Sequence, residues 1–278
     1  MIRQSEQEFL LMAMSIQDRN NVKIIGDGDT TLMLAHGFGC DQNMWRFIQP
    51  LLTPSYKLVL FDYVGCGQSD PAAFSKQRYQ SLNGYAQDVI EICNELQLKN
   101  IVFIGHSVSS IIGMLAAIES PTLFKKIVMI CPSPCFLNFP PHYFGGFDKS
   151  DLEELIDLMD KNYIGWANYL APLVMGQTNK AELIDELSES FCSTDPNYAK
   201  PFAKATFFSD DRETLQKLTL PTLVLQSKQD NLASVEIGKY MHEKMPNSTL
   251  EVIDSHGHCL HMTDPETVSH LINKFLDE

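Results

Sequence analysis

The sequence contains no apolar run long enough to cross a membrane, and it carries little positive charge. Lysine and arginine number 21 against 35 aspartates and glutamates, which gives a formal net charge of −14. Such an excess of negative charge repels polyanions, so we expect no nucleic acid and no anionic membrane surface among the partners. A membrane-spanning helix would need about 20 apolar residues in succession. These absences favour a soluble protein.

Signals for secretion are missing as well. The short apolar stretch at 9–14 follows Glu6 and Glu8 instead of a basic segment, unlike a signal peptide. Seven cysteines, an odd number, include no CxxC pair and no regular spacing, which is typical of reduced thiols in a cytoplasmic protein. Residues 1–13 show no clear element. The start of translation stays open among three methionines, Met1, Met12 and Met14.

Buried strands alternate with helical segments along the 278 residues. Because the strands are apolar on both faces, they predict a parallel sheet covered by helices on each side. Ordinary globular composition, with 44% hydrophobic residues and no internal repeat, fits one large α/β domain or two small ones. The predicted strands are 21–25, 31–35, 57–62, 101–104, 126–130, 221–226 and 249–253. The predicted core helices are 44–52, 82–98, 110–118 and 265–275.

A serine stands in a tight turn between a predicted buried strand and a predicted buried helix. The sequence there is Gly-His-Ser-Val-Ser, beginning at Gly105. A sharp strand-to-helix turn, or nucleophile elbow, strains its central residue and requires small residues two before and two after it. Gly105 meets this requirement, and Ser109 stands where a second glycine is usual. We infer that Ser107 is a nucleophile, with an ordinary buried serine as the alternative; for His106 we expect the backbone to matter more than the ring.

A glycine-rich loop follows the predicted strand at 31–35. Its sequence, His-Gly-Phe-Gly from His36, is typical of the place where an elbow-type hydrolase sets its second oxyanion donor. The helix N-terminus behind the elbow supplies the other donor. We therefore expect the backbone N–H groups of Phe38 and Val108 to form an oxyanion hole, with a plain glycine-rich turn as the alternative. The loop at 63–70 holds only G-x-G, so it gives little support to a dinucleotide site.

An acid and a histidine follow two later strands. Asp230 lies in the loop after the strand at 221–226, and His258 in the loop after the strand at 249–253. In an open parallel sheet the carboxyl ends of the strands form one edge, so these two residues and Ser107 are expected to meet there. A serine hydroxyl needs an imidazole to take its proton, and a carboxylate holds that imidazole in the right tautomer. The sequence therefore predicts a catalytic triad.

Other residues near His258 offer alternatives. Asp254 also follows a strand, but it lies only four residues before His258 in the same loop, so it is the weaker candidate for the acid. His256, His258 and His261 could form a metal cluster. Apart from Cys259, however, no acidic or cysteine set with ligand spacing surrounds them. We predict no metal, and we interpret His256 and His261 as loop or surface histidines.

The strand pattern stops between about residues 133 and 211. Four helical segments are predicted there, at 150–162, 165–175, 180–191 and 197–208. We interpret this stretch as a lid inserted into the core. The expected division is a first core part at 1–132, the lid at 133–211 and a second core part at 212–278. Most aromatic residues here should serve packing; the candidates for ligand contact are Phe136, Trp166 and Phe207.

Segments of both core and lid resemble the RsbQ-type α/β-hydrolases, whose founding member regulates a bacterial stress-response sigma factor. The chain is similar, more distantly, to the plant strigolactone and karrikin receptors. The specific segments lie in the lid region, because unrelated hydrolases share the elbow but not these: 132–135, 161–166 and 191–196. The supporting core segments are 36–42, 61–65, 85–89, 105–108 and 257–259.

This resemblance implies an α/β-hydrolase fold with a Ser107–His258–Asp230 triad under a four-helix lid, an apolar cavity between them, and no cofactor. It implies a serine hydrolase for a small apolar ester or lactone, in stress signalling beside a regulatory phosphatase. The alternatives are a small-molecule receptor with slow or no turnover and a cofactor-free peroxidase; a dehalogenase would need an acid in place of Ser107. Acidic helical faces at 151–160 and 182–189 are a candidate docking surface, with plain solvation as the alternative.

Overall fold

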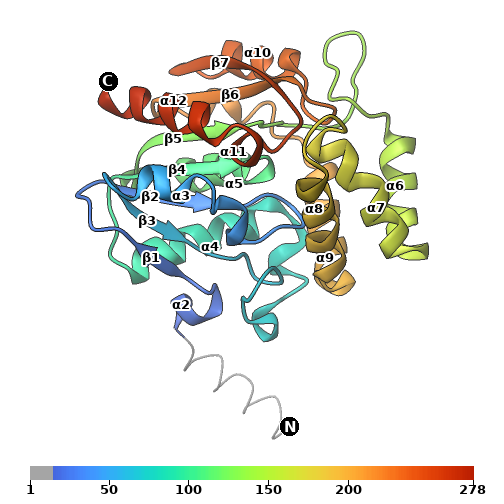
Figure 1. Ribbon diagram of the computed structural model, residues 1–278, viewed down its shortest axis with the longest axis horizontal. Helices are drawn as coiled ribbons and strands as arrows, with labels where there is room; N and C mark the ends of the chain where they lie inside the picture. The colour runs from blue at the N-terminus through green and yellow to red at the C-terminus, as the bar shows by residue number, and fades with distance from the viewer. Residues whose placement is uncertain (1–14) are drawn as a thin grey trace, which may run out of the picture.

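The computed structural model describes residues 15–278, so the expectations for residues 1–13 and for the start of translation lie outside the described residues. Seven strands form one sheet in the order β1-β3-β2-β4-β5-β6-β7 (Figure 1). Only β1 is antiparallel to its neighbour, and the other pairs are parallel. The strands are β1 Lys23–Ile25, β2 Thr31–Ala35, β3 Lys57–Leu60, β4 Ile101–His106, β5 Phe124–Ile130, β6 Thr222–Gln229 and β7 Ser248–His256.

Helices cover both faces of the sheet, as its apolar strands predict. Successive residues of β2 pack on opposite faces of the sheet. Leu32 and Leu34 pack with α3, α11 and α12, whereas Met33 and Ala35 pack with α4, α5 and α10. Successive side chains of a strand point to opposite faces, which explains the division. The core helices are α2 Ile16–Arg19, α3 Gln49–Leu52, α4 Leu82–Glu95, α5 Val108–Glu119, α10 Val235–Lys244, α11 Leu260–Thr263 and α12 Pro265–Asp277.

Four core segments differ from the sequence prediction, and two of them are the four-residue helices α2 and α11, which were not predicted. The helix expected at 44–52 is a 3-10 turn, Gln42–Trp45, followed by the short helix α3. Pro50 lacks a backbone N–H and is tolerated only in the first turn of a helix, so α3 begins just before it. Helix α10 was not predicted because it buries only Ile237, Gly238 and Met241, a thin apolar stripe.

Four helices lie between β5 and β6: α6 Lys149–Lys161, α7 Tyr163–Met175, α8 Ala181–Ser193 and α9 Pro196–Phe207. Figure 1 shows them gathered beside the core. Two of them bury apolar stripes at helical spacing, with Leu152, Ile156 and Met159 in α6 and Leu183, Leu187 and Phe191 in α8. The side chains of Asn162 and Asp195 accept hydrogen bonds from backbone N–H groups at the starts of α7 and α9. The helical stretches predicted from periodicity therefore agree with the structure to within a few residues.

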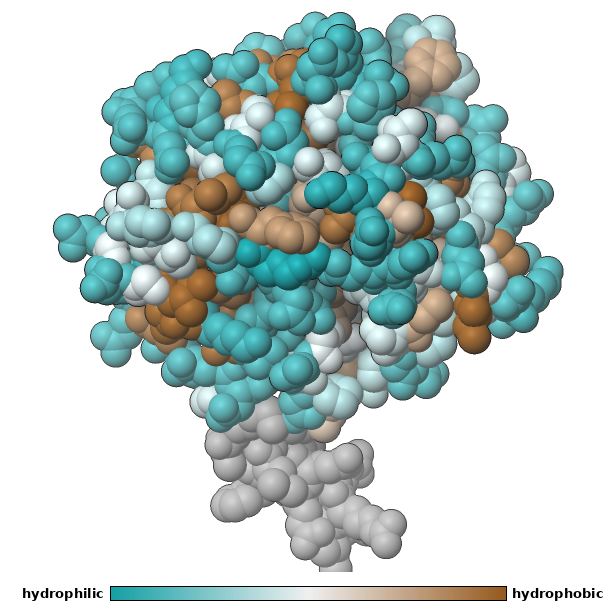
Figure 2. Space-filling model, viewed as in Figure 1, coloured by the Kyte–Doolittle hydropathy of each residue, from teal (hydrophilic) through white to brown (hydrophobic). Residues whose placement is uncertain are grey.

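The face of the molecule drawn in Figure 2 is mainly hydrophilic. Figure 2 shows a face on which apolar side chains form separated groups among polar ones. No helix between residues 15 and 278 combines the length and the apolar character that a membrane span requires. All seven cysteines are free, as expected, and only Cys192 is exposed.

Candidate active site

Ser107 occupies the turn between β4 and α5. Its backbone has φ 55° and ψ −122°, a strained conformation for a residue with a side chain. The strand and helix approach so closely that a Cβ on Gly105 would lie 2.6 Å from the backbone of Ser109. Glycine is therefore required at 105, and the turn has the geometry of a nucleophile elbow.

Ser109, which stands where the elbow usually has glycine, holds the neighbouring loop in place. Its hydroxyl donates to the carbonyl oxygen of His36 at 2.5 Å and lies 3.0 Å from the Tyr63 hydroxyl. Ser109 is fully buried, and its β-carbon is accommodated. The unusual serine therefore connects the elbow to the loop that carries Phe38.

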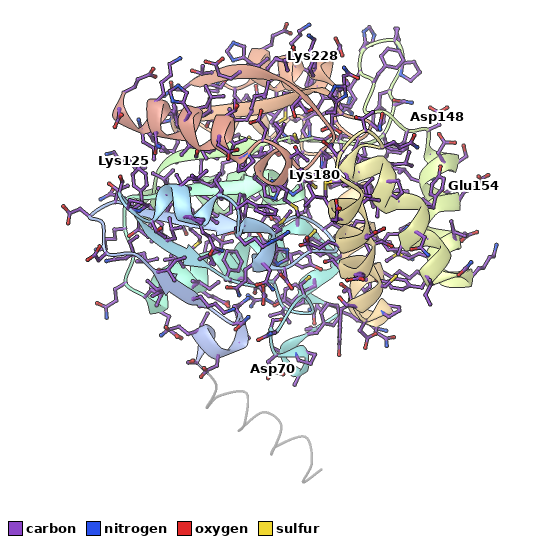
Figure 3. All side chains as sticks on the ribbon, viewed as in Figure 1. Asp70, Lys125, Asp148, Glu154, Lys180 and Lys228 are labelled. Carbon is purple, nitrogen blue, oxygen red and sulfur yellow. The ribbon has the colours of Figure 1, made fainter. Side chains whose placement is uncertain are left out.

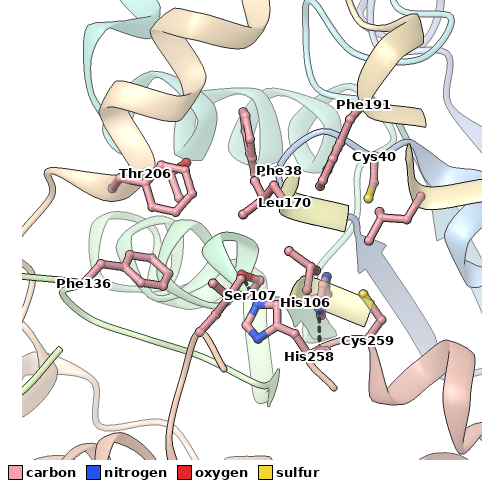
Figure 4. A pocket seen from close by; sticks show the side chains of 14 residues that line it. Phe38, Cys40, His106, Ser107, Phe136, Leu170, Phe191, Thr206, His258 and Cys259 are labelled. Atoms are coloured by element: carbon pink, nitrogen blue, oxygen red, sulfur yellow. Dashed lines mark hydrogen bonds between the residues drawn. The ribbon is translucent and has the colours of Figure 1, made fainter. Parts of the chain in front are cut away.

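A hydrogen-bonded chain runs from the elbow to the ends of β6 and β7. His258 Nε2 lies 2.7 Å from Ser107 Oγ, and His258 Nδ1 lies 2.7 Å from Asp230 Oδ2. The second carboxylate oxygen of Asp230 accepts from the backbone N–H groups of Leu232 and Ala233. The Asp230 side chain is fully buried and that of His258 is 2% exposed, so water is kept from both bonds. Figure 4 shows the His258 ring beside Ser107.

Asp254, the alternative acid, lies elsewhere. Its side chain is 83% exposed and pairs with Lys228 at 3.0 Å. An acid in that position is solvated and cannot orient the His258 ring, so the geometry favours Asp230.

Two histidines depart from expectation. His106 Nε2 donates to the backbone carbonyl of His258 at 2.9 Å, so the ring of His106, and not only its backbone, contacts the site. His261 was expected on the surface but is fully buried, with its ring 4.5 Å from the rings of both Trp45 and His106. The error has a physical cause: His261 lies on the inner side of α11, a four-residue helix too short to show periodicity. His256 is exposed, as expected.

Burial keeps both of these rings neutral. It lowers the pKa of His261 to about 3, with smaller contributions from His258 and Arg46. Burial also lowers the pKa of His106 well below its ordinary value, and His261 and His258 add to the shift. A positive charge that forms on His258 during a reaction is therefore not repelled by a second charged histidine beside it.

The expected oxyanion donors remain available for a ligand. The backbone N–H groups of Phe38 and Val108 make no hydrogen bond to any residue between 15 and 278. Val108 is the first residue of α5, where the N–H has no partner within the helix. The loop reaches this position through Gly39, whose φ is +71° and whose added Cβ would lie 2.2 Å from the Phe191 ring. The two donors are consistent with an oxyanion hole, which stays a prediction.

A small pocket of about 30 Å³ lies above Ser107 and His258, with room for about one or two water molecules. Phe136 and Phe207 line it, as expected from the sequence. Of the four inserted helices, α7, α8 and α9 contribute side chains to the pocket and α6 contributes none. The residues that sequence reasoning missed are Cys40, His106, Leu170, Val174, Leu187, Phe191, Thr206, Leu232 and Cys259. Four of them, Leu170, Val174, Leu187 and Phe191, are apolar residues on helices, and such residues cannot be told from core residues without the structure.

Trp166, the third candidate for ligand contact, does not line this pocket. It is 1% exposed and lies one layer behind the wall, with its ring 5.9 Å from Phe38, 5.4 Å from Phe191 and 5.3 Å from Tyr163. Its large ring is used to pack α7 against the pocket wall. Trp166 therefore lies behind the pocket wall, and its contact with a ligand stays a prediction.

Cys131 lies beside the hydrogen-bonded chain and was also missed. Ligand atoms of Cys131, Asp230 and His258 all lie within 4.8 Å of one another. Burial and the negative charge of Asp230 raise the pKa of the thiol well above its usual range, so it stays protonated. A protonated thiol binds metal poorly, and His258 and Asp230 already bond to each other. This group is better explained as part of the buried hydrogen-bonded site than as a metal centre.

Comparison with known proteins identifies the family. The sequence pattern of the alpha/beta hydrolase fold matches residues 30–265. The chain therefore belongs to the alpha/beta hydrolase fold family. It is 38% identical over 254 residues to the karrikin insensitive 2 receptor CA of Petunia hybrida, covering 91% of this chain and 94% of that protein. It is 34% identical over 263 residues to the strigolactone esterase D14 of Arabidopsis thaliana, covering 94% and 98%.

A solved structure is more similar still. A hydrolase from Oleispira antarctica is 58% identical, superposes with a TM-score of 0.93, and matches 95% of this chain and 96% of its own. Similarity of this extent covers the core and the four inserted helices together. The family and these relatives support a hydrolase of the esterase type.

Proposed function

We propose that this protein is a serine hydrolase that cleaves a small, mostly apolar ester or lactone. The observation that carries the proposal is the buried chain of hydrogen bonds from Ser107 through His258 to Asp230. His258 takes the proton of Ser107 as the serine oxygen attacks the carbonyl carbon. Asp230 holds the imidazole in the required tautomer and stabilises its charged form.

The remaining steps use groups that lie next to these three. The carbonyl oxygen becomes negative and is stabilised by the N–H groups of Phe38 and Val108. His258 then gives its proton to the leaving alcohol oxygen, which leaves an acyl group on Ser107. A water molecule then attacks the acyl carbon and loses a proton to His258. His258 gives this proton to Ser107 Oγ as the bond between the serine and the acyl group breaks, which releases the acid and restores the serine. For a lactone, the alcohol and the acid are parts of one product.

A serine-directed sulfonyl fluoride tests this assignment directly. We expect one adduct in the intact mass and its location on Ser107 after digestion, because only an activated serine reacts at a useful rate. Ser110 in the helix α5, which follows the turn, is the internal control, since its hydroxyl donates to the carbonyl of Gly105 and has no base beside it. The proposal fails if Ser107 stays unmodified or if Ser107→Ala is labelled equally.

The small pocket sets the range of acyl groups. We expect acetyl and butyryl esters of 4-nitrophenol to be cleaved faster than the decanoyl ester, because Phe136, Phe207 and Phe191 leave little room above Ser107. The measurement is kcat/KM across the series. A preference of more than about tenfold for the long chain, equal to about 1.4 kcal/mol, would contradict a site with so little room.

The names of the relatives favour a second candidate function. One relative is a karrikin insensitive 2 receptor and another a strigolactone esterase, which supports a receptor that binds or cleaves its ligand slowly. A receptor requires a ligand that binds one lid state more tightly than another. Steady-state turnover separates the candidates, since a single covalent event followed by slow release favours the receptor.

In the signalling role suggested by the RsbQ-type resemblance, the lid would bind a regulatory phosphatase. The support is an exposed acidic face on α6, formed by Asp151, Glu153, Glu154, Asp157 and Asp160. Figure 3 shows Glu154 on the outer side of the lid. The test is partner capture with charge-reversed α6 beside the unchanged protein. Equal retention of the partner by both would remove the docking proposal and leave the hydrolase proposal intact.

A further inference from the structure

Two side chains of the pocket wall carry a buried polar atom without a hydrogen-bond partner among residues 15–278, His106 at Nδ1 and Thr206 at its hydroxyl. His106 still donates through Nε2, whereas the side chain of Thr206 makes no hydrogen bond at all. Thr206, in α9, is 3% exposed and lines the pocket. Its hydroxyl is buried and has no hydrogen-bond partner among residues 15–278. A buried hydroxyl without a partner is unfavourable, so such a group requires an explanation.

Other threonines in this chain show what the usual arrangement is. Thr194 Oγ1 donates to the carbonyl of Ser190, and Thr263 Oγ1 donates to the carbonyl of Cys259, each four residues earlier. This bond to a carbonyl one turn earlier satisfies the hydroxyl of a threonine at the C-terminal end of a helix without any ligand. Thr206 does not make it, and its side chain faces the pocket instead.

The position of Thr206 gives its hydroxyl a distinct place in the site. Fourteen residues line the pocket, and four of them carry a side-chain oxygen or nitrogen. His106, Ser107 and His258 belong to the core, whereas Thr206 alone belongs to the lid. Figure 4 shows Thr206 across the pocket from Ser107 and His258. A ligand that fills the space between them meets the reacting groups at one end and a single hydroxyl at the other.

We propose that the Thr206 hydroxyl donates a hydrogen bond to a second oxygen of the substrate, on the side away from the scissile carbonyl. The inference rests on the proposed serine hydrolase and specifies its substrate class: a small apolar ester or lactone with a distal keto, ether or ring oxygen. The walls between the two ends are apolar, with Phe38, Phe136 and Phe207 among them. A purely hydrocarbon substrate would leave the hydroxyl unpaired, so it is bound less well.

The test compares oxygen-bearing esters with hydrocarbon analogues in two variants. Thr206→Val keeps the shape and removes the hydroxyl, and Thr206→Ser keeps the hydroxyl and removes the methyl group. The acyl-side pair is 4-nitrophenyl 4-oxopentanoate and 4-nitrophenyl pentanoate; the alcohol-side pair is 4-acetylphenyl acetate and phenyl acetate. The readout is the ratio of kcat/KM within each pair, relative to the unchanged protein, so that intrinsic reactivity cancels.

We expect Thr206→Val to lower the ratio about tenfold or more for at least one pair, and Thr206→Ser to keep it within about threefold. The inference is overturned if Thr206→Val lowers the ratio by less than threefold for both pairs. An equal fall in Thr206→Ser also overturns it, because the methyl group and not the hydroxyl would then be responsible.

A binding measurement separates this inference from the proposed function. In the Ser107→Ala background the same esters stay intact, and their dissociation constants are measured by calorimetry with and without Thr206→Val. If the protein cleaves none of the esters but Thr206→Val still lowers the binding ratio, the hydrolase proposal fails and the role of Thr206 stands. If cleavage occurs and neither ratio changes, the role of Thr206 fails and the hydrolase proposal stands.

Discussion

Replacement of Ser107 by alanine should lower kcat for any cleaved ester by about 10⁴-fold or more. The serine oxygen is the atom that forms the covalent bond, and no neighbouring side chain can replace it. The free energy of unfolding should change little, because the residue is small and its strained backbone is held by the surrounding turn. The measurement is kcat with a 4-nitrophenyl ester, together with a urea unfolding curve for each variant.

The same experiment extends to the other two members of the chain. His258→Ala should cause a loss similar to that of Ser107→Ala, and the double variant should lose hardly more than either alone, because the groups act as a unit. Asp230→Asn should lower kcat by about 10⁴-fold, because without the carboxylate His258 takes the tautomer that cannot accept the proton of Ser107. Asp254→Asn is the matched control, since this acid is exposed and pairs with Lys228. The assignment would be contradicted if the fold-losses in kcat of the two single variants multiplied in the double variant. It would also be contradicted if Asp254→Asn lowered kcat strongly.

The core of this fold and the three members of the hydrogen-bonded chain could be located from the sequence because each has a strong local signal. Strands that are apolar on both faces define a parallel sheet, and Ser107, Asp230 and His258 each follow such a strand. The turn around Ser107 adds a steric requirement, since Gly105 has no room for a side chain. The local sequence is therefore sufficient for these positions.

The pocket wall could not be located in the same way. Trp166 and Leu170 lie on the apolar helix α7 and Phe191 lies on α8, and helical spacing alone is the same for residues that face the ligand and residues behind the wall. Which of them line the pocket depends on how the inserted helices pack on Phe38, a contact between distant parts of the chain. For the same reason, the sequence could not show that the hydroxyl of Thr206 lies unpaired in the pocket wall.

Acid should destabilise this protein through its buried histidines. The pKa of His261 is about 3 in the folded protein, and an unfolded histidine has a pKa of about 6.5. Between these values the unfolded chain binds a proton that the folded protein does not. The stability contributed by the neutral ring is therefore fully present above about pH 6.5 and is lost as the pH falls toward 3.

We expect the free energy of unfolding to fall by about 2 kcal/mol for His261 alone between pH 7 and pH 5, since each pH unit below 6.5 counts for about 1.36 kcal/mol. His106, whose pKa is also lowered, adds to the loss. The measurement is urea unfolding at pH 7, 6 and 5, with the midpoint and the slope fitted at each pH.

Replacement of His261 by phenylalanine should make the protein less sensitive to acid. Neither ring nitrogen of His261 has a hydrogen-bond partner among residues 15–278, and the ring packs between Trp45 and His106, so an apolar ring of similar size fits the position. His256→Phe is the control, because His256 is exposed and should leave the pH dependence unchanged. If His261→Phe loses as much stability as the unchanged protein between pH 7 and pH 5, burial of this ring is not the cause of the acid sensitivity.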